Sequence, residues 1–370
     1  MIGIVGAGPG GLTAAVALRR AGFEVEVLER APTVRPVGAG ITLQVNAMRM
    51  LAALDLAAPI AAAGAPILRG RIAQPDGTSI VPLVQVTGTV AATTGVAIDR
   101  GALSRILEDA LPAGVIQVGQ AVRDVGPDAR VTTEDGAERA YDAVIGADGI
   151  HSAVRTAMFG ASPLRYSGYT CWRGLARVGG LDEMVERWGR GLRFGSVPLG
   201  PDTTYWFACA NEAAGGEDGP DPVADLSARF AGFEPLVTRL IRATPHIMRH
   251  DLFDLPPLAR WTRDQVTLLG DAAHAMTPNL GQGAGQAIED ALVLASALRA
   301  HGVAEGLSAY EAQRRPRATW FVRQSRQAGV VAQWEMPMAC FLRDRLAGLV
   351  PRTIVRRQLA QMYDVPIPTL

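Results

Sequence analysis

The hydrophobic pattern begins with a strand, a helix and a second strand. Residues 2–5 are a short apolar run of the buried-strand type. A helical pattern follows a glycine-rich turn and ends near Ala21–Gly22. Residues 23–28 then alternate apolar and acidic side chains. Three such elements within about 30 residues are typical of a parallel β-α-β unit.

The next part of the chain alternates short elements with turn signals. Helical periodicity covers residues 44–58 and 101–111, and short β runs broken by turns cover 67–98. Four further strands are expected at 115–118, 121–125, 129–133 and 141–146. We expect the last of these to join the first two strands in one parallel sheet.

The middle of the chain is predicted to be β-rich, and its end helical. Strand-like runs cover 168–178, 191–198 and 203–211, and a loop rich in Gly, Pro and acids covers 212–222. A strand at 266–269 is expected in the first sheet. Helical patterns then cover 281–300, 307–328 and 337–362. This order predicts an α/β fold whose β-rich middle is an insertion.

Three glycines follow the first strand at the spacing of a dinucleotide fingerprint. Gly6 allows a tight turn, Gly8 lets the backbone approach a pyrophosphate, and Gly11 permits close helix–strand packing. Glu29 ends the second strand, where an acid can hold ribose hydroxyls. The pattern indicates dinucleotide binding rather than an ordinary glycine-rich turn, and NAD and FAD both fit it.

Composition excludes several function classes. The 36 basic and 36 acidic residues give a net charge of zero, so nucleic acid is not expected as a partner. All basic residues are Arg, which excludes a Schiff-base lysine and a P-loop lysine. The three cysteines fit neither a disulfide framework nor a metal centre. We find no signal peptide and no membrane span, and we expect a cytoplasmic protein.

Two further segments resemble a known family. Residues 142–155 read DAVIGADGIHSAVR, and residues 270–284 read GDAAHAMTPNLGQGA. Together with the glycine fingerprint, they resemble the three motifs of the single-component FAD-dependent aromatic hydroxylases, the family of para-hydroxybenzoate hydroxylase. The resemblance runs in order over roughly residues 1–330.

The resemblance implies an architecture. It predicts an FAD-binding, Rossmann-like three-layer domain formed by residues 1–70, 99–165 and 261–330. A mixed β-sheet substrate domain over 71–98 and 166–260 is inserted into it, and C-terminal helices cover 331–370.

The resemblance also assigns residues to the cofactors. Arg100 would reach the ribityl-phosphate region of FAD, and Asp271 would bind a ribityl hydroxyl. Asp148 would lie in a segment shared by FAD and the nicotinamide donor, which Arg155 would help to dock. The full set of cofactor residues is Gly6, Gly8, Gly11, Glu29, Arg30, Arg100, Asp148, Arg155, Asp271, Gly281, Gly283 and Ala284.

The third motif has a physical reading of its own. Gly281 and Gly283 open a helix, so its free N–H groups and dipole would stabilise negative charge at the N1–C2=O edge of a flavin. Pro278 has a fixed φ and could form a rigid wall beside the ring. We interpret His274 and His151 as structural residues rather than as a base or a catalyst.

Candidate substrate residues lie in the β-rich middle. Period two places Tyr169, Cys171 and Arg173 on one face of a strand. The next two strands carry Arg193 and Tyr205, in a setting similar to the family subset that includes FAD-dependent urate hydroxylase. Arg193, Tyr205 and Pro278 are the predicted catalytic residues. Arg193 could orient an anionic substrate or stabilise charge on the peroxyflavin, and Tyr205 could hydrogen-bond the substrate or relay a proton. A solvated Arg and a Tyr at the edge of the core are the alternatives.

Arginines recur along the last helices. We expect most of them to be solvated, with the apolar residues between them packing on the FAD domain or on a second subunit. The stretches contain Arg314, Arg315, Arg317, Arg323, Arg326, Arg343, Arg345, Arg352, Arg356 and Arg357.

The resemblance implies a monooxygenase reaction. NADH or NADPH would reduce FAD, O2 would add at C4a, and the hydroperoxide would hydroxylate a small aromatic or heteroaromatic substrate. An epoxidase acting on an alkene and a non-catalytic flavin-binding module are the alternatives, and the lack of lysine argues against a flavin-dependent halogenase. The protein is expected to be a monomer or a homodimer.

Overall fold

A six-stranded sheet forms the centre of the part that is predicted to bind FAD. The computed structural model describes residues 1–34, 40–85 and 94–370. The strand order is β18-β19-β12-β1-β2-β8, with β18 antiparallel at one edge and the other strands parallel. The strands are β1 (Ile2–Val5), β2 (Val25–Glu29), β8 (Ile116–Val118), β12 (Ala143–Gly146), β18 (Thr262–Arg263) and β19 (Val266–Leu268). The strands predicted at 2–5, 23–28, 141–146 and 266–269 lie in this one sheet and pair in parallel, so this prediction is confirmed.

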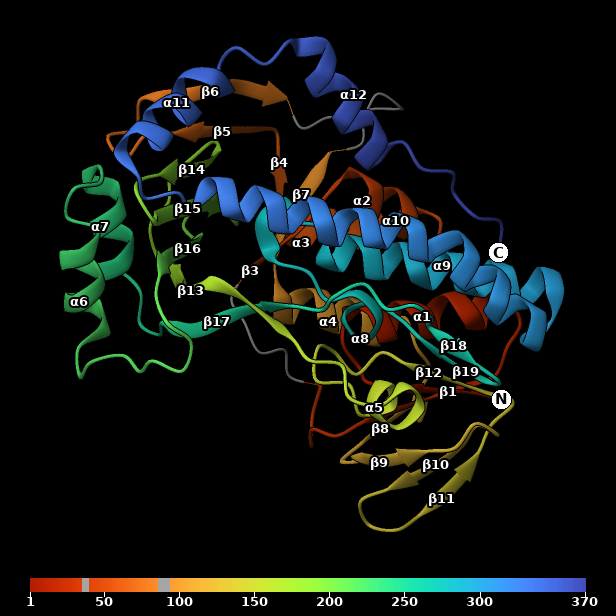
Figure 1. The fold of residues 1–370 in the computed structure, drawn as a ribbon. Helices are drawn as coiled ribbons and strands as arrows, with labels where there is room; N and C mark the ends of the chain where they lie inside the picture. The colour runs from red at the N-terminus through yellow and green to blue at the C-terminus, as the bar shows by residue number, and fades with distance from the viewer. Residues whose placement is uncertain (35–39, 86–93) are drawn as a thin grey trace.

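Helices cover one face of this sheet. α1 (Pro9–Arg20) packs against α9 (Gly283–His301), and α9 packs against α10 (Val303–Ala332) (Figure 1). On the other side lie α5 (Ala153–Phe159) and a small antiparallel sheet of β9 (Val122–Val125), β10 (Arg130–Thr133) and β11 (Glu138–Ala140). Ile4, Val27 and Ile145 are fully buried between these layers. The layered α/β fold class is therefore confirmed.

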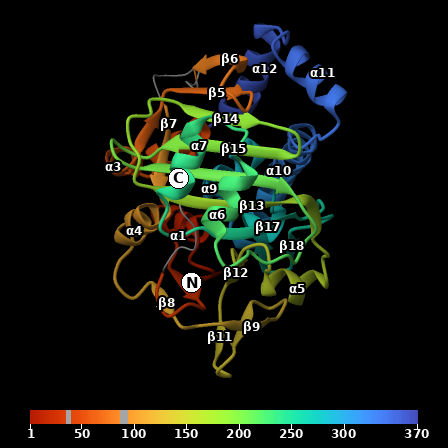
Figure 2. The same cartoon turned by 90° about the vertical axis from the view of Figure 1, so that its left-hand side faces the viewer.

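A second, seven-stranded sheet stands beside the first. Its order is β17-β13-β16-β15-β14-β5-β6, in which only the β14–β5 pair is parallel (Figure 2). The strands are β5 (Arg69–Ala73), β6 (Ser79–Gln85), β13 (Arg165–Ala176), β14 (Met184–Trp188), β15 (Leu192–Pro198), β16 (Thr204–Asn211) and β17 (Met248–Asp254).

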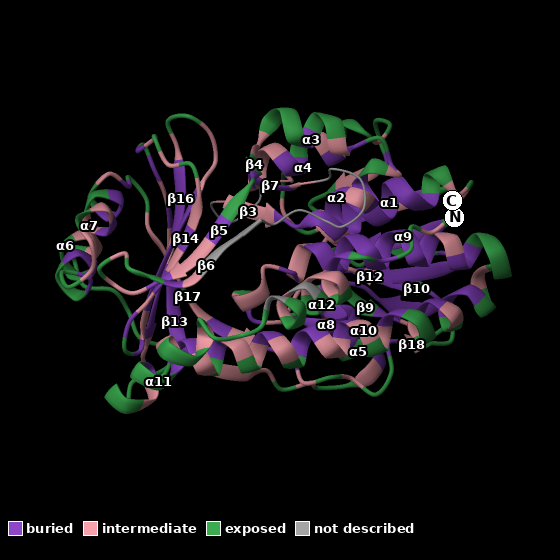
Figure 3. Cartoon of the chain, turned by 90° about the horizontal axis from the view of Figure 1, so that it is seen from above, coloured by how far each residue is buried: buried purple, intermediate pink, exposed green. Residues whose placement is uncertain are grey.

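The two faces of this sheet have different partners. α6 (Pro222–Arg229) and α7 (Pro235–Arg242) cover the face that points away from α1 and α9 (Figure 3). Trp172, Phe194 and Trp206 pack there against Phe230 and Leu240. Alternation along the strands turns the neighbouring residues toward the FAD-binding part, where substrate residues were predicted.

A smaller unit joins the two sheets. β3 (Gly40–Leu43), β7 (Gly95–Asp99) and β4 (Ala65–Ile67) form a three-stranded antiparallel sheet. α2 (Val45–Ala52), α3 (Ala57–Ala63) and α4 (Arg100–Asp109) pack around it. Part of the predicted β region, residues 86–93, lies outside the described residues.

Some predicted elements differ from the structure. The helix expected over 44–58 is two helices, since the chain turns at Asp55 with a φ of 57°. The helix expected over 337–362 is also two, α11 (Pro337–Ala347) and α12 (Arg352–Tyr363), because Pro351 begins a new helix. The sequence pattern did not predict β14, β17, α6 or α7. Within the described residues, none of the helices is long and apolar enough to cross a membrane.

Candidate active site

The glycine turn after β1 leaves a space at its centre. A Cβ on Gly6, whose φ is 106°, would lie 2.5 Å from the Ala147 carbonyl oxygen, and one on Gly11 would lie 2.0 Å from the Gly6 carbonyl oxygen. A Cβ on Gly8 would meet nothing within 4 Å. No side chain caps α1, so its first N–H groups point into this space. The turn is built for close approach of an anion.

Glu29 lies at the end of β2 beside this turn. Its two carboxylate oxygens accept hydrogen bonds from the backbone N–H of Ala7, at 2.8 Å, and of Ala31, at 2.9 Å. These bonds fix the carboxylate and leave lone pairs for ribose hydroxyls. Arg30 follows at the surface.

A second set of predicted cofactor residues surrounds the start of α9. Asp271 begins the short helix α8 (Asp271–His274) with its side chain exposed, and Pro278 is exposed at the start of the 3-10 turn η1 (Pro278–Leu280). Gly281 has a φ of 61°, and a Cβ on Gly283 would meet nothing within 4 Å. Ala284 is half-buried behind them.

Arg100, the first residue of α4, lies near this set. Burial lowers the pKa of Arg100, Arg173 lowers it further, and Asp271 opposes the shift. Arg100 therefore lies within electrostatic reach of Asp271 and of Arg173 on the seven-stranded sheet, which we call the substrate sheet after its predicted role.

The residues present fit FAD. Two helices, α1 and α9, begin at glycine-rich turns without side-chain caps. Glu29 is oriented at the first turn, and an exposed acid, Asp271, stands near the second. These are the donors and acceptors that a pyrophosphate, a ribose and a ribityl chain require.

Asp148 and Arg155 make structural contacts. The Asp148 carboxylate accepts from Ser152 Oγ at 2.5 Å and from the backbone N–H of Ala153 at 2.7 Å, so it fixes the start of α5. Arg155 is 4% exposed and donates to the carbonyl oxygens of Ile150, at 2.6 Å, and Ala272, at 2.9 Å. It thereby ties α5 to α8; its part in docking a nicotinamide donor stays a prediction.

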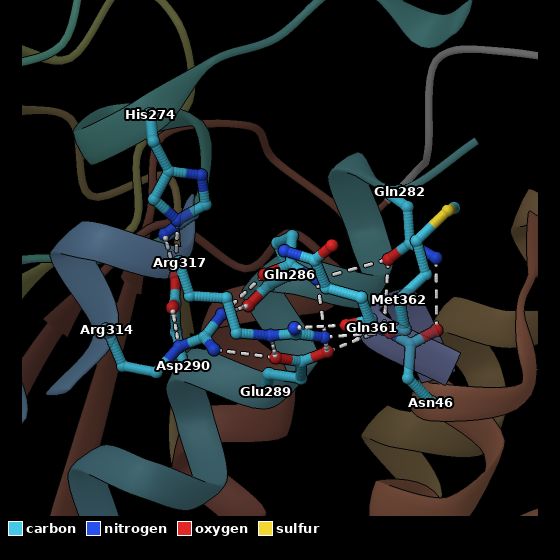
Figure 4. Close-up of polar contacts among 11 residues, drawn as sticks. Asn46, His274, Gln282, Gln286, Glu289, Asp290, Arg314, Arg317, Gln361 and Met362 are labelled. Atoms are coloured by element: carbon cyan, nitrogen blue, oxygen red, sulfur yellow. Dashed lines mark hydrogen bonds and ion pairs between the residues drawn. The ribbon is translucent and has the colours of Figure 1, made fainter. Parts of the chain in front are cut away.

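A buried ion cluster holds α9 beneath the cofactor residues (Figure 4). Arg314 of α10 donates to Glu289 Oε2 at 2.6 Å, to Asp290 Oδ1 at 2.7 Å and to Gln286 Oε1 at 2.7 Å. Arg317 donates to Glu289 Oε2 at 2.7 Å. The expectation of solvated arginines is therefore wrong for Arg314, which is 3% exposed and pairs with acids on the neighbouring helix.

The cluster extends to the turns on both sides. On one side, Asn46 of α2 donates to Glu289 Oε1 at 2.6 Å and to Gln282 Oε1 at 2.9 Å, next to Gly281 and Gly283. On the other, His274 Nε2 lies 2.6 Å from Asp290 Oδ2. His274 is thus a buried hydrogen-bonding residue, as the sequence indicates.

The charge state of Asp290 follows from its neighbours. Burial alone would raise the pKa of Asp290, but His274 and Arg314 outweigh it and lower this pKa to about 2. Glu289 behaves in the same way, because Arg314 and Arg317 keep its pKa below the usual value despite burial. Both carboxylates are therefore ionised at neutral pH.

The predicted substrate face is present on the seven-stranded sheet. Tyr169, Cys171 and Arg173 share one face of β13, and Cys171 pairs across the strands with Cys209 of β16. Both cysteines are buried and free. The hydrogen bond with Cys209 lowers the pKa of Cys171 despite its burial, and Arg173 adds to this effect.

Arg193 lies buried on the same face and donates hydrogen bonds to three side chains. It is 3% exposed, so the alternative of a solvated Arg is wrong. Its Nε donates to Gln333 Oε1 at 2.7 Å, one terminal nitrogen donates to Glu186 Oε1 at 3.1 Å, and the other donates to Asn279 Oδ1 at 2.9 Å. The guanidinium lies 5.2 Å from the ring centre of Tyr169.

Asn279 links Arg193 to the cofactor turn, and it was not among the residues predicted from the sequence. It follows Pro278 and donates to Tyr169 Oη at 2.9 Å, Thr277 Oγ1 at 2.8 Å and the Ser325 carbonyl oxygen at 2.8 Å. Its position in the third motif could have marked it as a site residue. Its partners Arg193, Tyr169 and Ser325 lie in distant segments, so the sequence does not reveal these contacts.

Tyr205 lies at the other end of the face. It pairs with Val197, whereas Arg193 pairs with Cys209, so the two predicted catalytic residues are four positions apart along the strands. Tyr205 is 9% exposed and packs on Gly40, whose Cβ would lie 2.7 Å from its ring. Burial raises the pKa of Tyr205 to about 12, so its hydroxyl keeps its proton at neutral pH.

Comparisons with known proteins support FAD as the cofactor. The chain matches the FAD binding domain family over residues 1–163 and 247–325. It is 43% identical over 359 residues to the aurachin C monooxygenase/isomerase of Stigmatella aurantiaca, covering 94% of this chain and 93% of that protein. It is 36% identical to the 2-heptyl-3-hydroxy-4(1H)-quinolone synthase of Pseudomonas aeruginosa, covering 97% of both.

A solved structure has the same fold. The crystal structure of Klebsiella pneumoniae HpxO complexed with FAD and uric acid superposes with a TM-score of 0.89 at 28% identity, covering 98% of this chain and 96% of that one. Since that structure contains FAD, the likeness supports the cofactor assignment.

Two glycine substitutions should separate folding from cofactor binding. Gly8→Ala adds a methyl group to open space, so the protein should fold while FAD binds about tenfold or more weakly. Gly11→Ala drives a Cβ into the Gly6 carbonyl and should prevent folding. Thermal unfolding and FAD titration measure both effects, with Gly232→Ala, which also enters open space, as the control. Normal FAD affinity in Gly8→Ala would contradict the assigned role.

The ion cluster should make the free energy of unfolding depend on pH in the acidic range. The unfolded chain binds a proton at the ordinary Asp pKa of 3.8, whereas folded Asp290 binds one near 2, so acid favours unfolding. A contribution of about 2 kcal/mol should be present near pH 6 and lost as pH falls from about 5 toward 2. Urea unfolding of Asp290→Asn should show a weaker pH slope than the exposed control Asp264→Asn. Equal slopes would show that Asp290 titrates normally.

Proposed function

The chain belongs to the FAD binding domain family of flavoprotein monooxygenases, and from this membership we propose that it hydroxylates a heteroaromatic ring bearing an apolar substituent. It is an enzyme whose cofactor is FAD. NADH or NADPH is the proposed reductant, and O2 the source of the inserted oxygen. A 4-quinolone with an alkyl chain is the first substrate to test.

The observation that carries this proposal is an apolar wall beside Tyr205. Ile67 and Val197 are buried next to its ring, and Leu175, Phe207 and Met248 pack against them while remaining partly accessible. Such a wall has no hydrogen-bond acceptors to offer a fully polar ring such as uric acid. It suits an aliphatic substituent, and the name of the Pseudomonas aeruginosa relative includes a heptyl group.

The polar end of the substrate has a partner on β13. The Nε of Arg173 is buried and makes no hydrogen bond within the described residues. A buried donor without a partner costs free energy, which a ring oxygen carrying negative charge would recover. Arg173 of β13 pairs with Phe207, two positions from Tyr205 on β16, so the two side chains share one face of adjacent strands and can face the same ring. We assign Arg173 to the ring oxygen and Tyr205 to a hydrogen bond with the ring.

The remaining residues orient the two halves of the site. FAD, when bound, supplies the redox and oxygen chemistry. The start of α9 at Gly281 and Gly283 presents N–H groups that stabilise negative charge. Pro278 shapes the turn, and Asn279 holds it at a fixed position relative to Arg193. Arg193 thereby places a positive charge beside the turn.

A substrate assay tests the function. Holoenzyme with 2-heptyl-4(1H)-quinolone should consume NAD(P)H faster than without it, and should give a product with one added oxygen on the heteroaromatic ring, by mass spectrometry and NMR. Uric acid should stimulate consumption less, because it cannot use the apolar wall. An epoxide on an alkenyl substituent would favour the epoxidase alternative. No stimulation by either compound in FAD-loaded protein would contradict the proposal.

The link between Arg193 and the turn can be tested separately. Asn279→Ala removes the acceptor of one Arg193 nitrogen, so the product formed per NAD(P)H consumed should fall, by about tenfold at most, with FAD affinity retained. Thr277→Val is the matched control, since Thr277 accepts a hydrogen bond from Asn279 in the same turn, whereas the described partners of Arg193 are Gln333, Glu186 and Asn279. An unchanged product ratio in Asn279→Ala would remove the link from the mechanism.

A further inference from the structure

The C-terminal helices expose an unusual amount of apolar surface. Ten of the fourteen large apolar side chains that are exposed in the described part of the chain lie between residues 330 and 354. On α11 they recur at helical spacing and form a stripe. We call the following six residues the C-terminal apolar face: Met336 (70% exposed), Met338 (66%), Phe341 (57%), Leu342 (47%), Leu346 (58%) and Leu349 (73%).

This face is held outward by buried polar contacts. Arg343 of α11 is 5% exposed and donates to the Ala332 carbonyl oxygen at 3.2 Å and to the Gly189 carbonyl oxygen at 3.4 Å. Its guanidinium also lies 5.2 Å from the ring centre of Trp188. The solvated role expected for Arg343 is therefore wrong.

The orientation of α11 is the reverse of that of an ordinary surface helix. Arg343 and Cys340 point inward, and its apolar stripe points to water. Because Arg343 fixes the helix, rotation cannot bury the stripe. A contiguous apolar surface on a rigid element marks a docking surface.

The charges around this face indicate what covers it. Residues 334–357 contain five arginines and two acids, a local excess of three positive charges in a chain whose net charge is zero. Asp344 pairs with the buried Arg343 at 2.8 Å, so the excess of three positive charges rests on the other four arginines and Glu335. Arg345 is exposed and extends over the Phe341 ring at 5.7 Å.

Apolar side chains flanked by arginines match an anionic lipid surface. The apolar groups enter the boundary between headgroups and acyl chains, and exposed arginines such as Arg345 and Arg357 reach the phosphates. A two-fold dimer on the same face would instead bring like charges together.

We propose that the C-terminal apolar face docks on an anionic lipid bilayer, with α11 in the headgroup region. α11 packs on β6 at the edge of the substrate sheet (Figure 1), so docking brings the substrate sheet to the bilayer. The proposal concerns binding alone and does not depend on the proposed substrate.

Vesicle sedimentation of the holoenzyme tests this docking in the absence of substrate. The protein should sediment with phosphatidylglycerol/phosphatidylcholine vesicles and much less with phosphatidylcholine alone, and added salt should weaken binding. The triple variant Phe341→Ser, Leu346→Ser, Leu349→Ser should bind about tenfold or more weakly. The matched control is Leu68→Ser, Val118→Ser, Ile367→Ser, which alters exposed apolar residues elsewhere and should bind as the wild type does.

Two results would overturn the proposal. One is equal binding of the wild type and the triple variant to anionic vesicles. The other is failure of the wild type to sediment, including the case in which light scattering shows a dimer that the triple variant loses, since a second copy would then cover the face. FAD absorbance and circular dichroism verify that each variant is folded. Because no substrate is present, a failed turnover assay leaves this result unaffected.

Discussion

Arg314 is buried between two adjacent carboxylates, and the position of the cofactor site depends on this arrangement. Glu289 and Asp290 each accept a short hydrogen bond from it. A buried ion is tolerable only when it is paired and fully hydrogen-bonded, and removing one partner leaves an uncompensated charge. The cluster therefore fixes α9 against α10, and it fixes the turns before α9 through His274 and Asn46.

The site is formed where three distant parts of the chain meet. The cofactor turn supplies Asn279, the substrate sheet supplies Arg193 and Tyr169, and the end of α10 supplies Gln333. These contacts are short and buried, so a shift of the sheet relative to the turn would break several hydrogen bonds together. A geometry of this kind keeps a substrate at a constant distance from a cofactor.

Much of the FAD-binding part could be predicted from the sequence. The glycines after β1 have direct steric reasons, and the strand, helix and acid around them occur in a fixed order. The alternation on β13 correctly placed Tyr169, Cys171 and Arg173 on one face. These features are local, so a short window of sequence contains them.

Other features could not be predicted because their causes are not local. Periodicity marks Arg314 and Arg343 as polar positions on helices, but their partners lie on another helix or on the substrate sheet. Arg193 donates a hydrogen bond to Gln333, which lies 140 residues further along the chain. The strands β14 and β17 are short and partly polar, and pairing with neighbouring strands, rather than their own pattern, defines them.

The strand order of the first sheet has a consequence for synthesis. β12 lies between β1 and β19, and β19 comes from residues 266–268, after the whole substrate sheet in the sequence. A ribosome therefore completes the substrate sheet while one edge of β12 still lacks its neighbour. An open, apolar parallel edge invites wrong pairing with other nascent chains. Once β19 has been synthesised it pairs with the exposed edge of β12, and α10 then packs over α9 on the completed sheet.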